Sequence, residues 1–182
     1  MKVTESFLLL LLLAACPMLK STSASESPPP NIYDALRELK EEIALLKGTQ
    51  VAFSVSLLPS GSETQGPFPV LTTLIFKHVL TNIGDGYNKH TGVFTAPVKG
   101  AYHFEWHVGA HGYTAGGLLV KNSTPIFLAY EKQTAHFGTA SNSATVLLEV
   151  GDTVVVRLWP HTKVYDNWNH HTTFSGHLLF LM

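Results

Sequence analysis

The sequence predicts an all-β domain preceded by a short helix, and three patterns support that fold class. From Gly100 the chain alternates strictly, with apolar side chains at every second position between Tyr102 and Ala110. A period of two with one apolar side is typical of a strand that borders a core. The stretch 96–100 combines proline and glycine, which mark a turn before that strand. Residues 31–47 show a helical period instead.

Composition narrows the class of protein further. A chain of 182 residues suits one domain with short appendages. The net charge of −1, without a basic stripe, argues against a nucleic-acid partner, because counterion release needs clustered lysine and arginine. The sequence has no serine-hydrolase, Walker or zinc-protease motif. We therefore expect no catalytic residues and no cofactor, and the protein is not expected to be an enzyme.

Residues 1–24 have the pattern of a secretory signal peptide. A lysine near the start precedes a leucine-rich run over 7–15, and small residues follow up to Ala24. The apolar run is too short for a membrane span, so we expect a secreted, extracellular protein without a transmembrane anchor. Cleavage is expected near Ala24, with Ala15 as the alternative. Cleavage near Ala24 would also remove Cys16, the only cysteine, and would leave a mature chain without disulfides.

Residues 25–30 form a serine- and proline-rich linker, and a short coiled-coil helix is expected over 31–47. Asn31 is placed to cap this helix. Its apolar residues step by four and three, which predicts a coiled-coil seam. The seam residues are Ile32, Leu36, Leu39, Ile43 and Leu46. The alternative is a lone amphipathic helix packed on its own domain. So few heptads cannot hold a coiled coil unaided, but they suffice if a larger domain supplies most of the association.

The remaining residues, 48–182, are assigned to one domain, and one stretch of it has a specific spacing. Aromatic residues, an asparagine and a glycine recur there at fixed offsets. Their positions are Phe76, Asn82, Tyr87, Phe94, Gly100, Tyr102, Phe104 and Trp106. The spacing resembles the signature of the C1q globular-head domain family, with tryptophan at the last position in place of the usual Phe or Tyr. The ranges that look like other strands of this family are 51–55, 121–127, 148–154 and 173–180.

The resemblance implies an antiparallel jelly-roll sandwich of about ten strands, of the C1q/tumour-necrosis-factor-like kind, that assembles as a homotrimer. The sequence has no Gly-X-Y run, so the collagen stalk of complement C1q is absent and the similarity is to stalkless secreted members. The last strand agrees with a trimer, because it has apolar residues on both faces. Phe174, Gly176, Leu178 and Phe180 share one face, and His177, Leu179 and Leu181 share the other. Leu147 likewise lies opposite Val146 and Leu148 on its own strand.

The loop before the last strand is the candidate ligand-binding surface. Its expected lining residues are Tyr165, Asp166, Trp168 and Asn169. An aromatic ring offers an apolar platform to a sugar, and nearby carboxylate and amide groups can bond the sugar hydroxyls. The alternative is that Trp168 folds back to cap its own sandwich.

Three other patterns have weaker functional interpretations. His103, Glu105, His107 and His111 share a strand face. A solvated surface is favoured there over a metal site, although protonation could make assembly or ligand binding sensitive to pH. The loop 110–117 has no carboxylate, so the calcium site of several C1q-domain relatives is expected to be absent, and no metal is expected. Asn122 begins a glycosylation sequon, and because Pro125 follows closely the alternative is an unmodified turn residue.

These features favour a secreted, trimeric, non-enzymatic recognition protein that binds microbial or cell-surface ligands in innate immunity. The runner-up is a signalling or adaptor ligand for a cell-surface receptor, similar to cerebellin. Cerebellin-type members usually have N-terminal cysteines, which the mature chain would lack, so the recognition protein is preferred. The expected partners are further copies of the same chain and a microbial glycan or cell-surface receptor.

Overall fold

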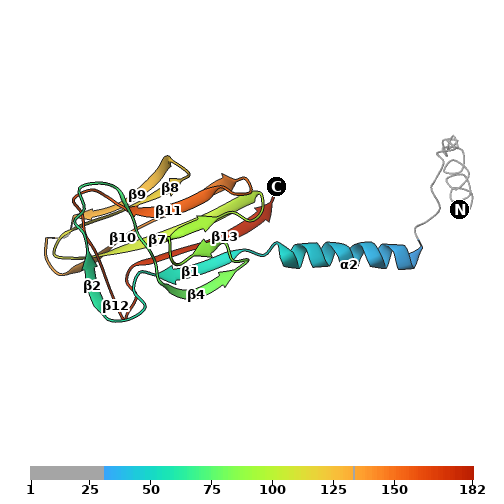
Figure 1. The fold of residues 1–182 in the computed structure, drawn as a ribbon, viewed down its shortest axis with the longest axis horizontal. Coiled ribbons are helices and arrows are strands. Elements are labelled where there is room, and N and C mark those ends of the chain that lie inside the picture. The colour runs from blue at the N-terminus through green and yellow to red at the C-terminus, as the bar shows by residue number, and fades with distance from the viewer. Residues whose placement is uncertain (1–30, 133) are drawn as a thin grey trace, which may run out of the picture. The chain divides into compact units, whose positions relative to one another are not determined.

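The computed structural model describes residues 31–132 and 134–182. The expected signal peptide (1–24) and linker (25–30) therefore lie outside the described residues. Within them the chain forms one helix, α2, and thirteen strands, β1 to β13 (Figure 1). No helix in this part of the chain is long and apolar enough to cross a membrane.

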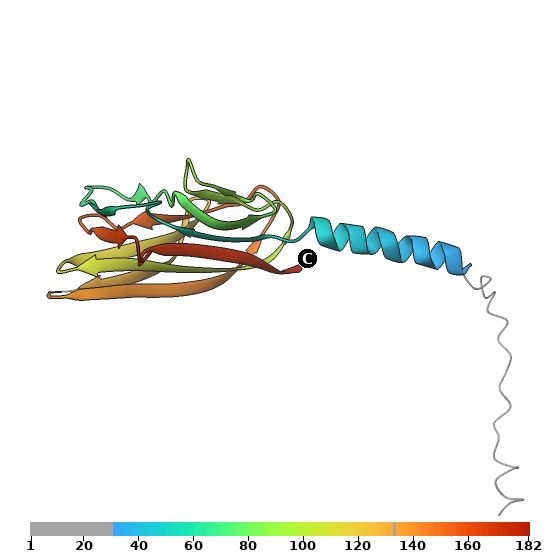
Figure 2. The ribbon, with the colours of Figure 1, turned by 90° about the horizontal axis from the view of Figure 1, so that it is seen from below.

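The strands form two sheets that lie face to face (Figure 2). The seven-stranded sheet contains β1 (Ala52–Ser56), β2 (Ser62–Gln65), β4 (His78–Ile83), β7 (Gly100–His111), β10 (Phe137–Leu148), β12 (Val164–Asn167) and β13 (Thr173–Leu181). The six-stranded sheet contains β3 (Thr72–Thr73), β5 (Tyr87–Asn88), β6 (Val93–Thr95), β8 (Thr114–Lys121), β9 (Thr124–Lys132) and β11 (Thr153–Leu158). The strand pairings are antiparallel, which confirms the expected sandwich. The strands outnumber the expected ten or so partly because β3 and β5 are only two residues long.

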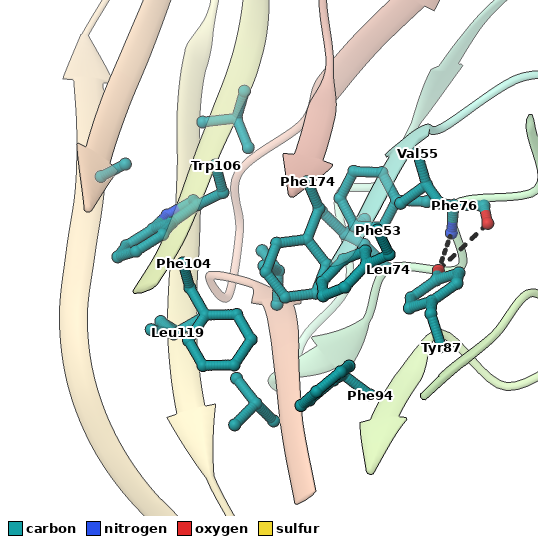
Figure 3. Packing of buried hydrophobic residues seen from close by; sticks show 14 of the residues in the cluster. Phe53, Val55, Leu74, Phe76, Tyr87, Phe94, Phe104, Trp106, Leu119 and Phe174 are labelled. Atoms are coloured by element: carbon teal, nitrogen blue, oxygen red, sulfur yellow. Dashed lines mark hydrogen bonds between the residues drawn. The ribbon is translucent and has the colours of Figure 1, made fainter. Parts of the chain in front are cut away.

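The core between the sheets is built largely from aromatic rings (Figure 3). The ring of Phe53, on β1, stacks on Tyr87 with centroids 5.1 Å apart and on Phe94 at 5.2 Å. Phe174 of β13 meets the same ring edge-on at 4.9 Å. Phe53 therefore joins the two sheets through one set of ring contacts.

The spaced signature residues are structural. Seven of them are buried, and Asn82 is half-buried. The Asn82 amide donates to the Tyr87 carbonyl oxygen at 2.9 Å and accepts from the Tyr87 N–H at 3.1 Å. The Tyr87 hydroxyl donates to the Phe76 carbonyl oxygen at 3.0 Å and accepts from the Phe76 N–H at 3.2 Å (Figure 3). Burial raises the pKa of Tyr87, so its hydroxyl remains a donor at physiological pH.

The tryptophan at the end of the signature is accommodated by a glycine on the facing sheet. The indole N–H of Trp106 donates to the Gly117 carbonyl oxygen at 2.8 Å. A Cβ atom at Gly117 would lie 2.8 Å from a Val108 methyl and 3.2 Å from the indole ring. The indole ring of Trp106 therefore fits because Gly117, which lies opposite it, has no side chain.

The helix α2 (Ile32–Gly48) begins where its cap predicts. Asn31 Oδ1 accepts the Tyr33 N–H at 3.2 Å, as an N-cap side chain does. All five seam residues are exposed, between 44% for Ile43 and 77% for Ile32. Their apolar side chains are thus available to a partner, and the coiled coil remains a prediction.

The last strand departs from the expected pattern at its end. Phe174 and Gly176 are buried and Leu178 is half-buried, as expected. The pairing of β13 with β7 then shifts register between Leu178 and Phe180, and Phe180 is exposed. The expectation that Phe180 shares the buried face is therefore wrong, because an extra residue in the strand reverses the alternation. This shift leaves Leu179, Phe180 and Leu181 all exposed in one chain.

Candidate ligand-binding loop

The candidate site lies on β12 and on the loop 168–172 that connects it to β13. β12 pairs with β2 over its whole length and with β7 where Tyr165 lies opposite Gly109. In Figure 1 this corner lies at the end of the sandwich away from the C-terminus. The long strands of the sheet therefore position the loop at one tip of the domain.

Asp166 is not part of the accessible surface. Its side chain is fully buried, its Oδ2 accepts the Leu58 N–H at 2.9 Å, and its Oδ1 accepts the Thr172 N–H at 3.2 Å. Both oxygens thus accept backbone N–H groups, one from the segment after β1 and one from the end of the loop. The expectation that Asp166 lines the ligand surface is corrected: this carboxylate holds the loop in place.

Further hydrogen bonds fix the rest of the loop. Asn167 Oδ1 accepts the Asn169 N–H at 2.8 Å, and the Asn167 carbonyl accepts the His170 N–H at 2.9 Å. The Thr172 hydroxyl donates to the Tyr165 carbonyl at 2.7 Å and accepts the Gly109 N–H at 2.9 Å. A loop closed by this many internal bonds presents its exposed side chains in a defined arrangement.

Trp168 lies at the tip of this loop and is 69% exposed. The alternative that it folds back over its own sandwich is therefore wrong. The large apolar face of this indole is therefore accessible from solvent. Asn169 beside it is also exposed.

Tyr165 belongs to an aromatic cluster next to the loop, made of Tyr165, His111, Phe137 and His171. Phe137 and His171 have ring centroids 4.3 Å apart, and Tyr165 lies 5.9 Å from His111. The Tyr165 hydroxyl accepts hydrogen bonds from Ser62 Oγ and Asn167 Nδ2, both at 3.0 Å. This arrangement leaves a half-buried phenol beside exposed imidazole and phenyl rings.

Sequence reasoning did not include His111, Phe137 and His171 in the candidate site. The signal that joins them is the strand register, since Phe137 of β10 is the direct partner of His111 on β7. Gly109 supplies the room, because a Cβ atom there would meet Phe137 at 3.2 Å and His171 at 3.3 Å. Neither fact can be obtained without the pairing of distant strands.

A serine–histidine pair connects the loop to the end of β1. Ser56 Oγ is 2.7 Å from His170 Nδ1, and the His170 ring stacks on His78 with centroids 4.4 Å apart. Nucleophilic catalysis also needs a group that orients the imidazole and donors for an oxyanion. Within the described residues no carboxylate contacts His170, and Ser56 is almost fully buried. The pair therefore has the geometry of a packing contact.

The histidines of β7 are arranged by neighbouring hydroxyls. His103 Nδ1 lies 3.2 Å from Thr145 Oγ1, and His107 Nδ1 lies 2.7 Å from Ser141 Oγ. His107 Nε2 also approaches Glu105 Oε1 at 3.2 Å. In the part of the chain that the structure describes, no group of three or more ligating side chains converges as a metal site would require.

The sequon asparagine is part of a clamp between two turns. Asn122 Nδ2 donates to Asp152 Oδ1 at 3.0 Å, while Asn122 Oδ1 accepts the Thr153 N–H at 2.9 Å. Lys121 Nζ lies 2.9 Å from Asp152 Oδ2. The hydrogen bond from Asn122, followed by those from the Glu149 backbone and Lys121, lowers the pKa of Asp152 to about 2. The amide that would accept a glycan is thus already engaged.

Replacing Asn122 by glycine is expected to raise the pKa of Asp152 from about 2 toward its ordinary 3.8. Asn122 has a φ of 52°, which glycine adopts freely, so only the side chain is lost. Because the folded pKa is depressed, the clamp stabilises the protein above about pH 4, and this contribution falls away as the pH drops toward 2. A carboxyl titration followed by NMR measures the shift. Ser123→Ala, which leaves the clamp intact, is the matched control, and an unchanged pKa in the glycine variant would contradict the clamp.

Comparison with known proteins agrees with this architecture. Residues 52–179 match the family model of the C1q domain. The globular domain of the zebrafish complement 1qA protein is 23% identical, with a TM-score of 0.59 over 72% of this chain and 99% of that chain. Murine APRIL, crystallised at pH 5.0, is 12% identical, with a TM-score of 0.55 over 71% of this chain and 99% of that one. Eiger TNF from S. frugiperda is 11% identical, with a TM-score of 0.54 over 74% and 95% of the two chains.

The fold, the buried signature and these likenesses define a C1q/TNF-like jelly-roll domain. The chain belongs to the C1q domain family, as the spacing of its aromatic residues predicts. The solved structures support the fold alone, since their identities are low.

Proposed function

We propose that the protein is a secreted, homotrimeric, non-enzymatic recognition protein that binds microbial or cell-surface ligands in innate immunity, with a carbohydrate as the expected ligand of its loop. In this proposal residues 1–24 are a signal peptide, 25–30 a linker, 31–47 a short coiled coil and 48–182 the recognition domain. The observation that supports ligand binding most directly is Trp168, an indole 69% exposed on a loop held by internal hydrogen bonds.

The chemistry of the loop suits a carbohydrate. A pyranose ring has an apolar face that packs on an aromatic ring, and hydroxyls that need directional partners. Trp168 and the half-buried ring of Tyr165 offer aromatic surface to the apolar face of the sugar. The exposed amide of Asn169 offers hydrogen bonds to its hydroxyls. Asp166 contributes indirectly, because its buried carboxylate holds the loop.

The trimer is supported by apolar side chains that one chain leaves exposed. The helix seam is one such set, and Leu147, Leu179 and Leu181 are another. When a neighbouring copy covers these leucines, the free energy of association becomes more favourable by about 25 cal/mol for each Å² of apolar surface removed from water. A short seam adds to this association without being sufficient for it.

Trp168→Ala is expected to weaken glycan binding by about 2 kcal/mol, roughly thirtyfold, while the melting temperature stays unchanged. The reason is that the indole makes its main contacts with the ligand, not with its own domain. A microbial glycan array followed by calorimetry on the best ligand measures the effect. Tyr130→Ala removes an aromatic residue of 52% exposure on β9 and is the matched control.

Two results would count against this assignment. Equal binding by wild type and Trp168→Ala would remove the loop from the site, and a fall of several degrees in melting temperature would make Trp168 structural. If the protein instead bound receptor ectodomains and no glycan, the signalling or adaptor function would replace the proposed one.

A further inference from the structure

One face of the seven-stranded sheet has an unusual composition, and we name it the histidine face. It consists of three cross-strand rows over β4, β1, β13, β7 and β10. The rows are Ile83–Ala52–His177–His103–Thr145, Thr81–Ser54–Ser175–Glu105–Ser143 and His78–Ser56–Thr173–His107–Ser141. The alternate residues of these strands, such as Phe53, Phe104 and Phe174, point into the core. The histidine face is therefore the side of the sheet away from the core.

This face is depleted of charge. Glu105 is the only carboxylate in the three rows, and none of their residues is lysine or arginine. The whole chain, by contrast, contains 12 Lys plus Arg and 13 Asp plus Glu. A solvated sheet face normally carries charged residues, whereas the centre of a protein interface lacks them. Exposed Leu147 and Leu179 lie on strands of the same sheet. This composition favours a second copy of the chain as the occupant.

The histidines of the face lie close to one another even within one chain. His103 and His177 are direct cross-strand partners, and their ring centroids are 5.7 Å apart. His107 lies four residues along β7 from His103, and its Nε2 is 3.2 Å from Glu105 Oε1. His78, at the rim, stacks on His170. Beyond Gly109 the same strand continues to His111, whose ring is 5.9 Å from that of Tyr165, and the ring of Tyr165 is in turn 6.3 Å from that of His171.

We infer that the histidine face is a self-association surface that releases its partner copies in acid. This inference rests on the proposed homotrimer and deepens it. Histidine is the side chain that gains charge between about pH 8 and pH 5. Every copy adds His103, His107 and His177 to the interface, with His78 at the rim, and only one carboxylate, Glu105. The facing residues of β1 and β10 are alanine, serine and threonine, which cannot neutralise the added charge.

The direction of the effect follows from proton binding. In separated copies the imidazoles can be hydrated when protonated, but in the assembly they are brought together, so the separated form binds more protons. Association therefore weakens as the pH falls. For each proton that only the separated form binds, the association constant falls about tenfold when the pH is lowered by one unit.

Light scattering and sedimentation of the full secreted protein at pH 7.5, 6.5 and 5.5, at micromolar concentration, test this inference. We expect trimers at pH 7.5 and folded, smaller species at pH 5.5, with far-UV circular dichroism unchanged. A monomer at pH 7.5 would overturn the proposed trimer itself. A trimer at both pH values would leave the trimer standing and overturn the acid release.

Two variants identify the groups responsible. His103→Gln with His177→Gln removes the two imidazoles that face each other across β7 and β13, and it is expected to move the dissociation midpoint to lower pH. Glu105→Gln removes the only carboxylate of the face and is expected to move the midpoint to higher pH. His90→Gln, an exposed turn residue outside the three rows, is the control. Dissociation at the same midpoint in all four proteins would show that the histidine face is not the sensor.

Discussion

Phe53→Ala is expected to lower the free energy of unfolding by about 3–5 kcal/mol. The Phe53 side chain is 3% exposed, and its ring contacts residues of both sheets. Tyr87 and Phe94 approach it from the six-stranded sheet, and Phe174 from the seven-stranded one. Alanine would leave a cavity that these rings cannot fill without leaving their hydrogen-bonded strands.

Chemical denaturation of the wild type and the variant, followed by tryptophan fluorescence, measures this difference. Phe127→Ala is the matched control, because that phenylalanine is 52% exposed on β9. The control is expected to change stability by less than about 1 kcal/mol. A loss at Phe53 no larger than the loss at Phe127 would show that the rings repack.

Asp166→Ala is expected to destabilise the domain by about 2–5 kcal/mol, because the substitution leaves two backbone N–H groups without their acceptor. These donors belong to Leu58, after β1, and to Thr172, before β13. The two segments are joined through this one buried carboxylate. Ligand binding is expected to fall with stability in this variant, unlike in Trp168→Ala, where binding alone is lost.

Glu63→Ala provides the comparison for Asp166. Glu63 is the direct cross-strand partner of Asp166 on β2, yet its side chain is exposed. Removal of this carboxylate is expected to change the melting temperature little. If both alanine variants melted at the wild-type temperature, water would have to satisfy the two N–H groups, and Asp166 would lose its structural role.

The sandwich could be predicted from sequence because its core follows local rules. The alternation from Tyr102 to Ala110 places its apolar residues inside, and the structure buries all of them. The spacing of the signature residues also predicted the family, since their ring and amide contacts require fixed offsets. Asn31 was recognisable as a helix cap for the same reason: its partner, the Tyr33 N–H, is two residues away.

The residues whose positions the sequence did not predict depend on contacts between segments that are distant in the sequence. Asp166 looks like a surface residue among polar neighbours, but its partner Leu58 lies 108 positions away. The register shift that exposes Phe180 has no local sequence mark, since it depends on how β13 pairs with β7. The aromatic cluster was missed because only strand register brings Phe137 next to His111.

The central position of β13 also has a consequence for how the domain forms. β13 pairs with β1 on one side and with β7 on the other, and residue 52 is the direct partner of residue 177. Until β13 arrives, both neighbours have an open edge with unpaired backbone groups, which can capture strands of other chains. Pairing over so long a stretch of chain is slow compared with the closing of local hairpins. The chain is therefore expected to be most prone to pairing with other copies of itself in the interval before residues 173–181 join the sheet.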